Sequence, residues 1–400
     1  MSGRICTRYR DDDGLDVGCH LLSKEYMIEN YPSLVDQAKV PGLWLWGSGT
    51  SGQLGNNTTI NSSSPVQSIS AGSNWRSITT GTFHSAAIKT DGTLWSWGLG
   101  SEGQLGNNAA TSRSSPVQTI PGGTNWRSAS AGARHTASIK TDGTLWIWGF
   151  GTSGQLGNNA ATSRSSPVQT ISGGANWKSV SAGGCHTAAI KTDGSLWLWG
   201  QGAFGGLGNN LTTNQSSPVQ TVSAGTNWRS VSNHSISTAA IKTDGTLWTW
   251  GDNGTGKLGT NSLVHSSSPV QTISGGTNWR RVSMGGEQIA SIKTDGTLWI
   301  WGAGTEGQLG TNSIISHSSP VQTISGGTNW RSVVSSQVHI ASIKTDGSLW
   351  LWGYNGSGRL GNDSVARLSS PVQTISGGTN WRSVDSRDTH TAAIKDLGDF

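Results

Sequence analysis

One pair of neighbouring side chains has the residue types of a nucleophilic site. Cys185 is followed directly by His186, and a histidine that accepts the proton of a thiol can generate a reactive thiolate. If this segment is a β-strand, however, neighbouring side chains point to opposite faces and the two groups do not meet. No third residue nearby is placed to orient the imidazole. We therefore predict no catalytic residue and no enzymatic activity.

Five histidines recur at equivalent positions of a repeated pattern, which raises the question of a metal site. They are His84, His135, His186, His339 and His390. Equivalent positions in repeated units lie around an axis, so these imidazoles do not converge on one ion. The three cysteines also lack the spacing of a zinc site. We expect hydrogen-bonding histidines, no bound metal and no cofactor.

The interval that separates equivalent histidines is the period of the whole repeat. Trp-x-Trp pairs recur every 51 residues from Trp44 to Trp350, and a third tryptophan keeps the same step from Trp75 to Trp381. These series contain all 21 tryptophans of the chain. A repeat of this length indicates a propeller, solenoid or array. Because the tryptophans occur in every unit, they indicate a core rather than a surface that stacks sugars or bases.

Each unit contains four short segments of strand-forming residues. In the first complete unit they are Ser64–Ile69, Trp75–Thr79, His84–Lys89 and Thr93–Gly98. The Asp-Gly between the last two is typical of a hairpin turn. Four short antiparallel strands in each of seven units predict an all-β fold, a seven-bladed β-propeller over residues 43–395.

The ends of the repeat region predict how the ring closes. The region starts at Leu43 with a strand of the fourth kind and stops at Lys395 after strands of the first three kinds. We therefore expect one N-terminal strand and three C-terminal strands to form the closing blade, which removes two exposed edges.

The chain outside the repeats is short. Residues 1–42 are too few to build a core of their own, and a short helix is expected between Ser23 and Pro32. Apolar side chains in this segment favour an anchor that docks on other structural proteins over a flexible leader. The anchor residues are Tyr26, Met27, Tyr31 and Leu34. Residues 396–400 form a C-terminal tail, and no apolar run is long enough to insert in a membrane.

Charge is unevenly distributed along the chain. The repeat region is basic, and both ends are acidic. A ring of repeated lysines and arginines could attract a polyanion. However, an aspartate follows most of the ring lysines after two residues, as Asp91 follows Lys89. Solvated or locally paired charge is therefore the simpler interpretation, and nucleic acid is not an expected partner.

The segments LWSWG, GQLG (Gly103–Gly106), SSP and HTAAI together resemble the regulator of chromosome condensation repeat family. The resemblance implies a seven-bladed propeller. The family includes a nucleotide-exchange factor for a GTPase, whose inserted loop has no counterpart in these equal-length units. It also includes an ultraviolet-B photoreceptor. The light-sensing tryptophans of that protein would fall on Thr82, Ala133, Gly184, Ser235, Gly286, Gln337 and Asp388, none of which is tryptophan.

The units disagree with one another in two places. One is the triplet of residues before each third-kind segment, such as Gly81–Phe83, and the other is the loop after each Trp-x-Trp strand. In an up-and-down blade these loops emerge on one face, and loops on a rigid scaffold commonly carry recognition. We predict a binding face that rings the channel mouth, with neutral drift as the alternative. Its residues are Phe83, Arg134, Cys185, Ile236, Glu287, Val338 and Thr389, together with Arg113 and Arg164.

Two functions remain open from the sequence. The uniform repeats loosely resemble those of marine bacteriophage virion proteins, which implies a non-enzymatic structural component of a virion. Such a component would be made in the host cytoplasm, dock through residues 1–42 and present the variable loops to a host surface protein or glycan. The alternative is a cytoplasmic regulatory or inhibitory propeller that binds a protein partner such as a GTPase.

Overall fold

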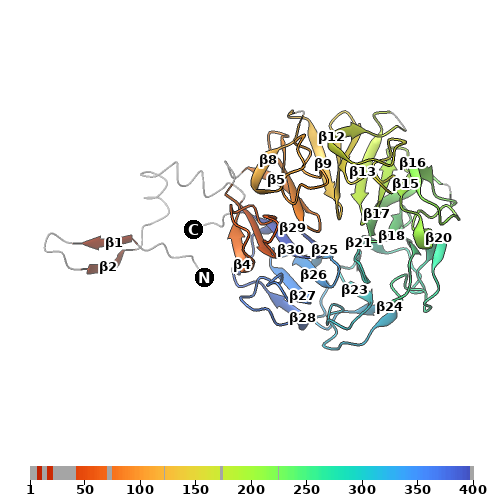
Figure 1. The fold of residues 1–400 in the computed structure, drawn as a ribbon. Coiled ribbons are helices and arrows are strands. Elements are labelled where there is room, and N and C mark those ends of the chain that lie inside the picture. The colour runs from red at the N-terminus through yellow and green to blue at the C-terminus, as the bar shows by residue number, and fades with distance from the viewer. Residues whose placement is uncertain are drawn as a thin grey trace.

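The fold is a ring of seven four-stranded antiparallel sheets around a central axis (Figure 1). The computed structural model describes residues 7–10, 16–20, 42–69, 74–120, 122–171, 174–223 and 225–396. The first two ranges are described by their backbone alone. The predicted seven-bladed all-β propeller is therefore confirmed.

Each blade has four strands from the channel outward, and equivalent strands begin with equivalent residues. The innermost strands are β5 (Trp75–Thr80), β9 (Trp126–Ala131), β13 (Trp177–Ala182), β17 (Trp228–His234), β21 (Trp279–Met284), β25 (Trp330–Ser335) and β29 (Trp381–Arg387). The second strands are β6 (His84–Lys89), β10 (His135–Lys140), β14 (His186–Lys191), β18 (Ser237–Lys242), β22 (Gln288–Lys293), β26 (His339–Lys344) and β30 (His390–Lys395).

The outer half of each blade contains the Trp-x-Trp strand and the SPVQ strand. The third strands are β3 (Gly42–Gly47), β7 (Leu94–Gly98), β11 (Leu145–Gly149), β15 (Leu196–Gly200), β19 (Leu247–Gly251), β23 (Leu298–Gly302) and β27 (Leu349–Gly353). The outermost strands are β4 (Ser62–Gln67), β8 (Arg113–Gln118), β12 (Arg164–Gln169), β16 (Gln215–Gln220), β20 (Ser266–Gln271), β24 (His317–Gln322) and β28 (Leu368–Gln373). A single 3-10 turn in the described residues, η1 (Ala203–Gly205), follows β15.

The predicted hairpin turn is built by its own side chains. The Oδ1 atom of Asp91 accepts hydrogen bonds from the backbone N–H of Thr93 at 2.8 Å and from its hydroxyl at 2.7 Å. The Thr93 hydroxyl oxygen in turn accepts the indole N–H of Trp95 at 2.9 Å. Gly92 has a φ of 83°, which favours glycine. These contacts explain why KTDG recurs almost unchanged.

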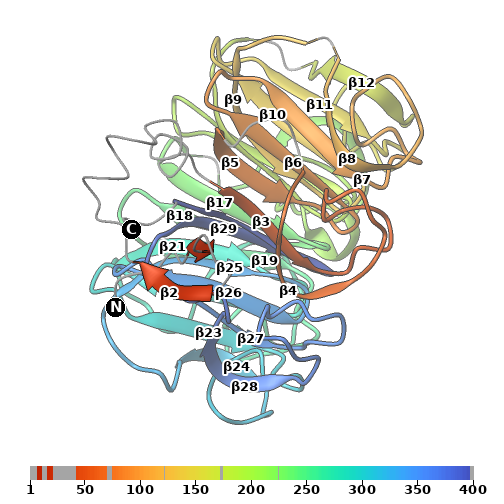
Figure 2. The ribbon, with the colours of Figure 1, turned by 90° about the vertical axis from the view of Figure 1, so that its left-hand side faces the viewer.

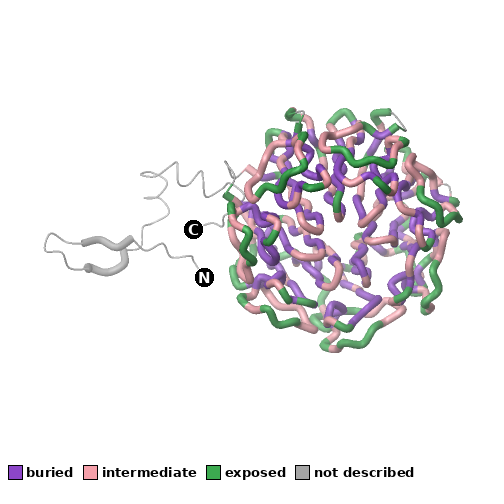
Figure 3. The backbone as a smooth tube through the Cα atoms, viewed as in Figure 1, coloured by how far each residue is buried: buried purple, intermediate pink, exposed green. Residues whose placement is uncertain are grey.

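The core lies between neighbouring blades, and Figure 3 shows buried residues along the inner strands and exposed residues mostly at the outer rim. The Trp75 and Trp97 rings of one blade lie 6.0 Å apart and pack with Leu43 and Leu45 of the preceding blade. The indole N–H of Trp97 also donates to the Gln53 carbonyl in the loop of that preceding blade, at 2.9 Å. The equivalent tryptophan makes the equivalent bond in every blade. Repeated tryptophans therefore join each blade to the next.

The closing blade differs from the prediction in how the two ends of the chain share it. Its strand order is β29-β30-β3-β4, so two C-terminal strands form one sheet with two N-terminal strands, and β3 lies between β30 and β4. Figure 2 labels β3, β4 and β29 of this blade. The expected division of one and three is wrong because the SPVQ segment pairs with the preceding Trp-x-Trp strand, as Leu45 pairs with Val66. The long loop that joins them folds back along its own blade instead of crossing to the next.

The N-terminal segment is described only in part. Strands β1 (Thr7–Arg10) and β2 (Asp16–His20) form an antiparallel hairpin that the sequence did not predict. The expected helix and the anchor residues Tyr26, Met27, Tyr31 and Leu34 lie outside the described residues, as do residues 397–400. Within the described ranges, no helix has the length and apolar character to cross a bilayer.

Candidate functional site

The loops of the propeller divide into two faces, as the topology predicts. The loop after β7 begins beside the triplet of its own blade, because the Leu99 N–H donates to the Phe83 carbonyl at 2.8 Å. The hairpin turn instead meets the connection between blades, where Trp126 N–H donates to Gly92 at 3.1 Å. We call the first side, with the triplets and the loops after the third strands, the variable-loop face. The other side, with the KTDG and SGGTN-type turns, is the turn face.

The seven residues predicted to ring the mouth do lie on the variable-loop face. Arg134 is exposed and lies over the Phe150 ring at 5.7 Å, while the other six are partly buried. They are Phe83, Cys185, Ile236, Glu287, Val338 and Thr389. None of the seven lines the channel cavity in the described structure, which measures about 100 Å³. Their proposed role in binding stays a prediction.

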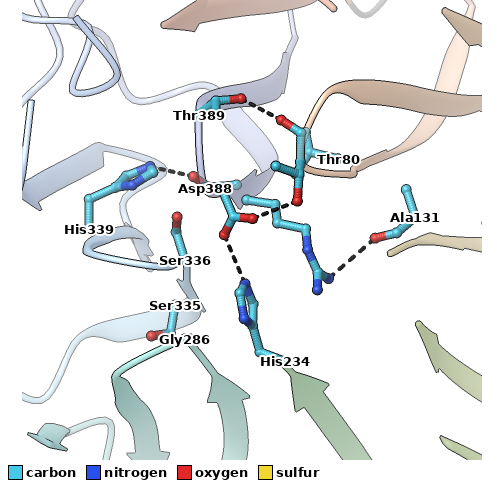
Figure 4. Close-up of polar contacts among 12 residues, drawn as sticks. Thr80, Ala131, His234, Gly286, Ser335, Ser336, His339, Asp388 and Thr389 are labelled. Atoms are coloured by element: carbon cyan, nitrogen blue, oxygen red, sulfur yellow. Dashed lines mark hydrogen bonds and ion pairs between the residues drawn. The ribbon is translucent and has the colours of Figure 1, made fainter. Parts of the chain in front are cut away.

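The side chains that meet over the channel come from the first two positions of the triplets. Arg387 reaches across the axis, and its Nη1 donates to the carbonyl of Ala182 at 2.9 Å and to that of Ala131 at 3.5 Å. The Nε2 atom of His234 lies 3.1 Å from Oδ1 of Asp388, and the two side chains face each other in Figure 4. We call Arg387, Asp388, His234 and nearby Asp385 the channel cluster.

Burial and charge set the protonation of the channel cluster. Burial alone would raise the pKa of Asp388, but His234, Arg387 and a hydrogen bond from Thr82 outweigh it and hold this pKa well below its usual range. Burial and the Arg387 charge lower the pKa of His234 against the opposing effect of Asp388. Burial raises the pKa of Asp385, although Thr80 donates two hydrogen bonds to it. At pH 7 these lowered pKa values leave His234 neutral and Asp388 ionised.

Local backbone geometry explains why these two blades supply the cluster. β17 and β29 run one residue further than their equivalents, so His234 pairs with Ser237 and Arg387 with His390. Asp388 turns the chain at a φ of 41°, a region that aspartate tolerates better than most residues. Sequence reasoning missed the cluster because it singled out the third triplet position. The sequence feature that could have revealed the cluster is the first triplet position, where most units have glycine but these two have His234 and Arg387.

The repeated histidines are structural, in agreement with the expectation from their spacing. His84 Nε2 lies 2.9 Å from the hydroxyl of Thr136 in the next blade, and His135 makes the equivalent contact with Thr187 at 3.0 Å. Burial lowers the pKa of His84 and of His135 to about 3. These imidazoles are therefore neutral at pH 7. In the described parts of the chain, no three His, Cys, Asp or Glu side chains form a metal-binding group.

Cys185 does not form the nucleophilic pair that its neighbour suggests. His186 Nε2 lies 3.0 Å from the Thr238 hydroxyl, and its Nδ1 lies 3.1 Å from the Ser235 carbonyl. Burial raises the pKa of the Cys185 thiol, with a smaller opposing effect from Arg134 and Arg387. The thiol is therefore protonated, and the residues around it lack the geometry of a catalytic pair.

The repeated cations are held locally, but their partners are not the ones expected. Lys140 lies over the Trp146 ring at 4.4 Å and the Trp126 ring at 4.9 Å. The Nη2 of Arg127 donates to the Trp177 carbonyl of the next blade at 2.8 Å. The aspartate after the lysine, Asp142, accepts hydrogen bonds from Thr144 instead. Cation–π contacts and bonds between blades therefore take the place of lysine–aspartate pairs.

The variable-loop face has two chemically different sectors. Loops of five blades expose aliphatic side chains, and the largest pairs are Leu263 (61%) with Val264 (75%) and Ile314 (55%) with Ile315 (64%). Isolated aliphatic residues occur at Ile60, Leu211 and Val365. The two blades that lack them instead expose Arg113 and Arg164, and in the described structure neither arginine forms an ion pair. An apolar sector beside a basic sector fits recognition of a protein surface.

The fold and this face define a repeat propeller with diversified loops. The sequence matches the Regulator of chromosome condensation (RCC1) repeat in seven segments, residues 42–88, 91–139, 142–190, 193–241, 244–292, 295–343 and 346–394. Since these segments span most of the chain, the protein belongs to the RCC1 repeat family.

Curated relatives in this family differ widely in length and name. The chain is 30% identical over 312 residues to the ultraviolet-B receptor UVR8 of Arabidopsis thaliana, covering 74% of this chain and 69% of UVR8. It is 28% identical over 367 residues to the mitochondrial RCC1 domain-containing protein RUG3 of the same plant, covering 83% and 82%. In the human E3 ubiquitin-protein ligase HERC2, the identity is 27% over 297 residues, which cover 71% of this chain and 6% of HERC2.

Solved structures share the fold at lower identity. Human WBSCR16 has a TM-score of 0.79 at 19% identity, covering 89% of this chain and 98% of that one. Yeast RCC1 (Prp20), solved bound to Kap60, has a TM-score of 0.77 at 15% identity and covers 89% of each chain. At these identities the likeness concerns the fold alone.

Proposed function

We propose that this protein is a non-enzymatic regulatory propeller that binds a protein partner through its variable-loop face. The observation that carries the proposal is the contrast between the faces. The turns of the turn face repeat almost unchanged, whereas the variable loops differ between blades. Two of these loops expose paired aliphatic side chains, and two others expose arginines that form no ion pair among the described residues. Contiguous apolar surface with a charged border is characteristic of protein interaction sites.

The relatives support a protein partner without naming it. They include a receptor and a ubiquitin ligase. A GTPase is one partner of the kind we expect, and the cytoplasm is the compartment we propose. The second hypothesis, a virion component that binds a host protein or glycan through this face, draws no support from these relatives. Light sensing is not carried over, because the second triplet positions contain no tryptophan.

The test removes the apolar sector and keeps the ring intact. The variant Leu263→Ser, Val264→Ser, Ile314→Ser, Ile315→Ser changes exposed residues of the loops after β19 and β23. The matched control is Ile273→Ser with Ile324→Ser in the same two blades, where residues of 55% and 57% exposure lie in the connections on the turn face. Proteins captured by the tagged chain in cells of its source would be compared by mass spectrometry. We expect the four-residue variant to lose a partner that the control retains.

Equal capture by the wild type and the four-residue variant would contradict the proposal. Loss of the same partner from the turn-face control alone would place binding on the opposite side. If the basic sector contributes, Arg113→Ser with Arg164→Ser should also reduce capture. The difference in capture between this variant and the wild type should then shrink at high salt, because salt screens the exposed arginine charges.

A further inference from the structure

Three neighbouring blades form an arginine-lined cavity at the turn-face end of their innermost strands. The cavity measures about 460 Å³ and is lined by Arg229, Ser230, Arg280, Arg281, Val282 and Val333. These residues belong to β17, β21 and β25. The turn face lies close by, because Trp279, directly before Arg280, donates its N–H to the Gly245 carbonyl of a hairpin turn. The cavity is therefore distinct from the variable-loop face.

One of these arginines is a departure from the repeat. The residue after the ring cation is serine in six units, whereas β21 has Arg281 at this position. The serines are Ser77, Ser128, Ser179, Ser230, Ser332 and Ser383. A guanidinium has thus been added beside the Arg229 and Arg280 of the ring. At this position the side chain is both larger than the serine of the other units and positively charged.

The ring arginines Arg229 and Arg280 are held in place by some of their N–H groups, and their other N–H donors remain available. Arg229 Nη2 donates to the Trp279 carbonyl at 2.6 Å, and Arg280 Nη2 donates to the Trp330 carbonyl at 2.9 Å. All hydrogen bonds that these two side chains donate in the described structure use Nη2, so Nη1 and Nε remain for a ligand. Each guanidinium is therefore pre-positioned by the neighbouring blade, which lowers the entropy lost on binding an anion.

The cluster carries positive charge without a balancing acid. Among the described residues, Arg229, Arg280 and Arg281 form no ion pair. Burial, together with the charges of Arg280 and Arg331, lowers the pKa of Arg281. The same repulsion would be relieved by a bound anion. Guanidinium groups bind phosphate through paired, parallel hydrogen bonds, which is the geometry that a cluster of arginines favours.

We propose that this cavity binds the phosphate groups of a small polyphosphorylated molecule, with Arg281 as the residue that creates the site. A cavity of this size falls within the range of about 300–1,000 Å³ that small ligands occupy. A nucleic-acid duplex is too wide to enter it. The valines beside the arginines give the cavity an apolar wall for the rest of the ligand. This site goes beyond the proposed partner binding and does not depend on it.

The test measures binding of tripolyphosphate to the full chain by isothermal titration calorimetry at low salt. Arg281→Ser introduces the residue of the other six units, so the fold is expected to tolerate it. We expect this variant to bind tripolyphosphate at least tenfold more weakly than the wild type. Arg113→Ser, on the variable-loop face, is the charge-matched control and should bind as the wild type does.

The proposal is overturned if the wild type shows no binding of tripolyphosphate, or if Arg281→Ser binds it as tightly as the wild type. An equal loss in Arg113→Ser would also overturn it, since binding would then reflect net charge. A DNA duplex that binds through Arg281 when tripolyphosphate does not would indicate a nucleic-acid surface instead. ATP serves as a second probe. Competition of ATP with tripolyphosphate for one site supports the proposal and would identify a nucleotide as an acceptable source of the phosphates.

Discussion

Replacing one buried histidine should make the protein measurably less sensitive to acid. His135 is fully buried between blades, and burial lowers its pKa to about 3, with smaller contributions from the Arg387, His84 and His186 charges. In the unfolded chain a histidine titrates near 6.5. As the pH falls from 7.5 to 5.5, the unfolded state takes up about 0.8 proton at this position while the folded state takes up almost none. The stability present above pH 6.5 is therefore progressively lost.

The size of this loss of unfolding free energy follows from the difference in proton uptake between the unfolded and folded states. Over this pH interval the loss is about 1.4 kcal/mol for one such histidine. Five repeat-equivalent histidines have lowered pKa values, namely His84, His135, His186, His339 and His390. Together they would remove about 7 kcal/mol, which is comparable with the total stability of about 5–15 kcal/mol of a typical domain. The wild type should therefore be much less stable at pH 5.5 than at pH 7.5.

His135→Gln is the informative variant because the protein already contains glutamine at the equivalent place. Gln288 in β22 is fully buried, and its side-chain amide donates to the Ser335 hydroxyl at 3.1 Å and the Ser336 carbonyl at 3.0 Å. Urea unfolding followed by far-UV circular dichroism at pH 7.5 and 5.5 gives the pH-dependent loss of stability. We expect this loss to be about 1.4 kcal/mol smaller in the variant. An unchanged loss in His135→Gln would refute the account of buried neutral histidines.

Two further predictions concern the core and the channel. Trp97→Ala removes a fully buried ring and its hydrogen bond to the Gln53 carbonyl, so it should lower the unfolding free energy by about 3–5 kcal/mol. The control Trp95→Ala removes a half-buried ring and should lower it by less. Equal stability of Trp97→Ala and the wild type in urea unfolding would contradict the assignment of Trp97 to the core. Arg387→Met removes the hydrogen bonds to the Ala182 and Ala131 carbonyls and a charge that favours ionised Asp388, so it should lower the unfolding free energy by about 1–3 kcal/mol. Adding Asp388→Asn should restore part of the loss. Additive losses in that double variant would show that the two side chains do not interact.

The sequence was sufficient for the architecture because every unit must bury the same side chains. Trp97 and Trp75 recur at a fixed step, and a period of 51 residues with four strand-like segments leaves a propeller as the consistent solution. The division of the closing blade could not be derived in the same way. It depends on whether the long loop after β3 returns to its own blade. In the structure Leu54 of this loop is fully buried, and the Gly49 N–H at its start donates to the Asn61 Oδ1 at its end, at 3.0 Å.

The candidate site was only partly accessible to sequence reasoning. Disagreement between units located the variable-loop face and its residues Arg113 and Arg164. It could not show which triplet position points over the channel, because this depends on the one-residue extension of β17 and β29. The cavity around Arg281 was also missed, although the sequence contained its signal, an arginine at a position where the other units have serine.

The central claim is that the variable-loop face binds a protein partner, and hydrogen–deuterium exchange on the captured complex tests it most directly. We predict that the partner slows exchange in the loops 252–265 and 303–316, which contain Leu263, Val264, Ile314 and Ile315, and leaves the hairpin turns 243–246 and 294–297 unchanged. Protection of those turns with no change in the two loops would contradict the claim.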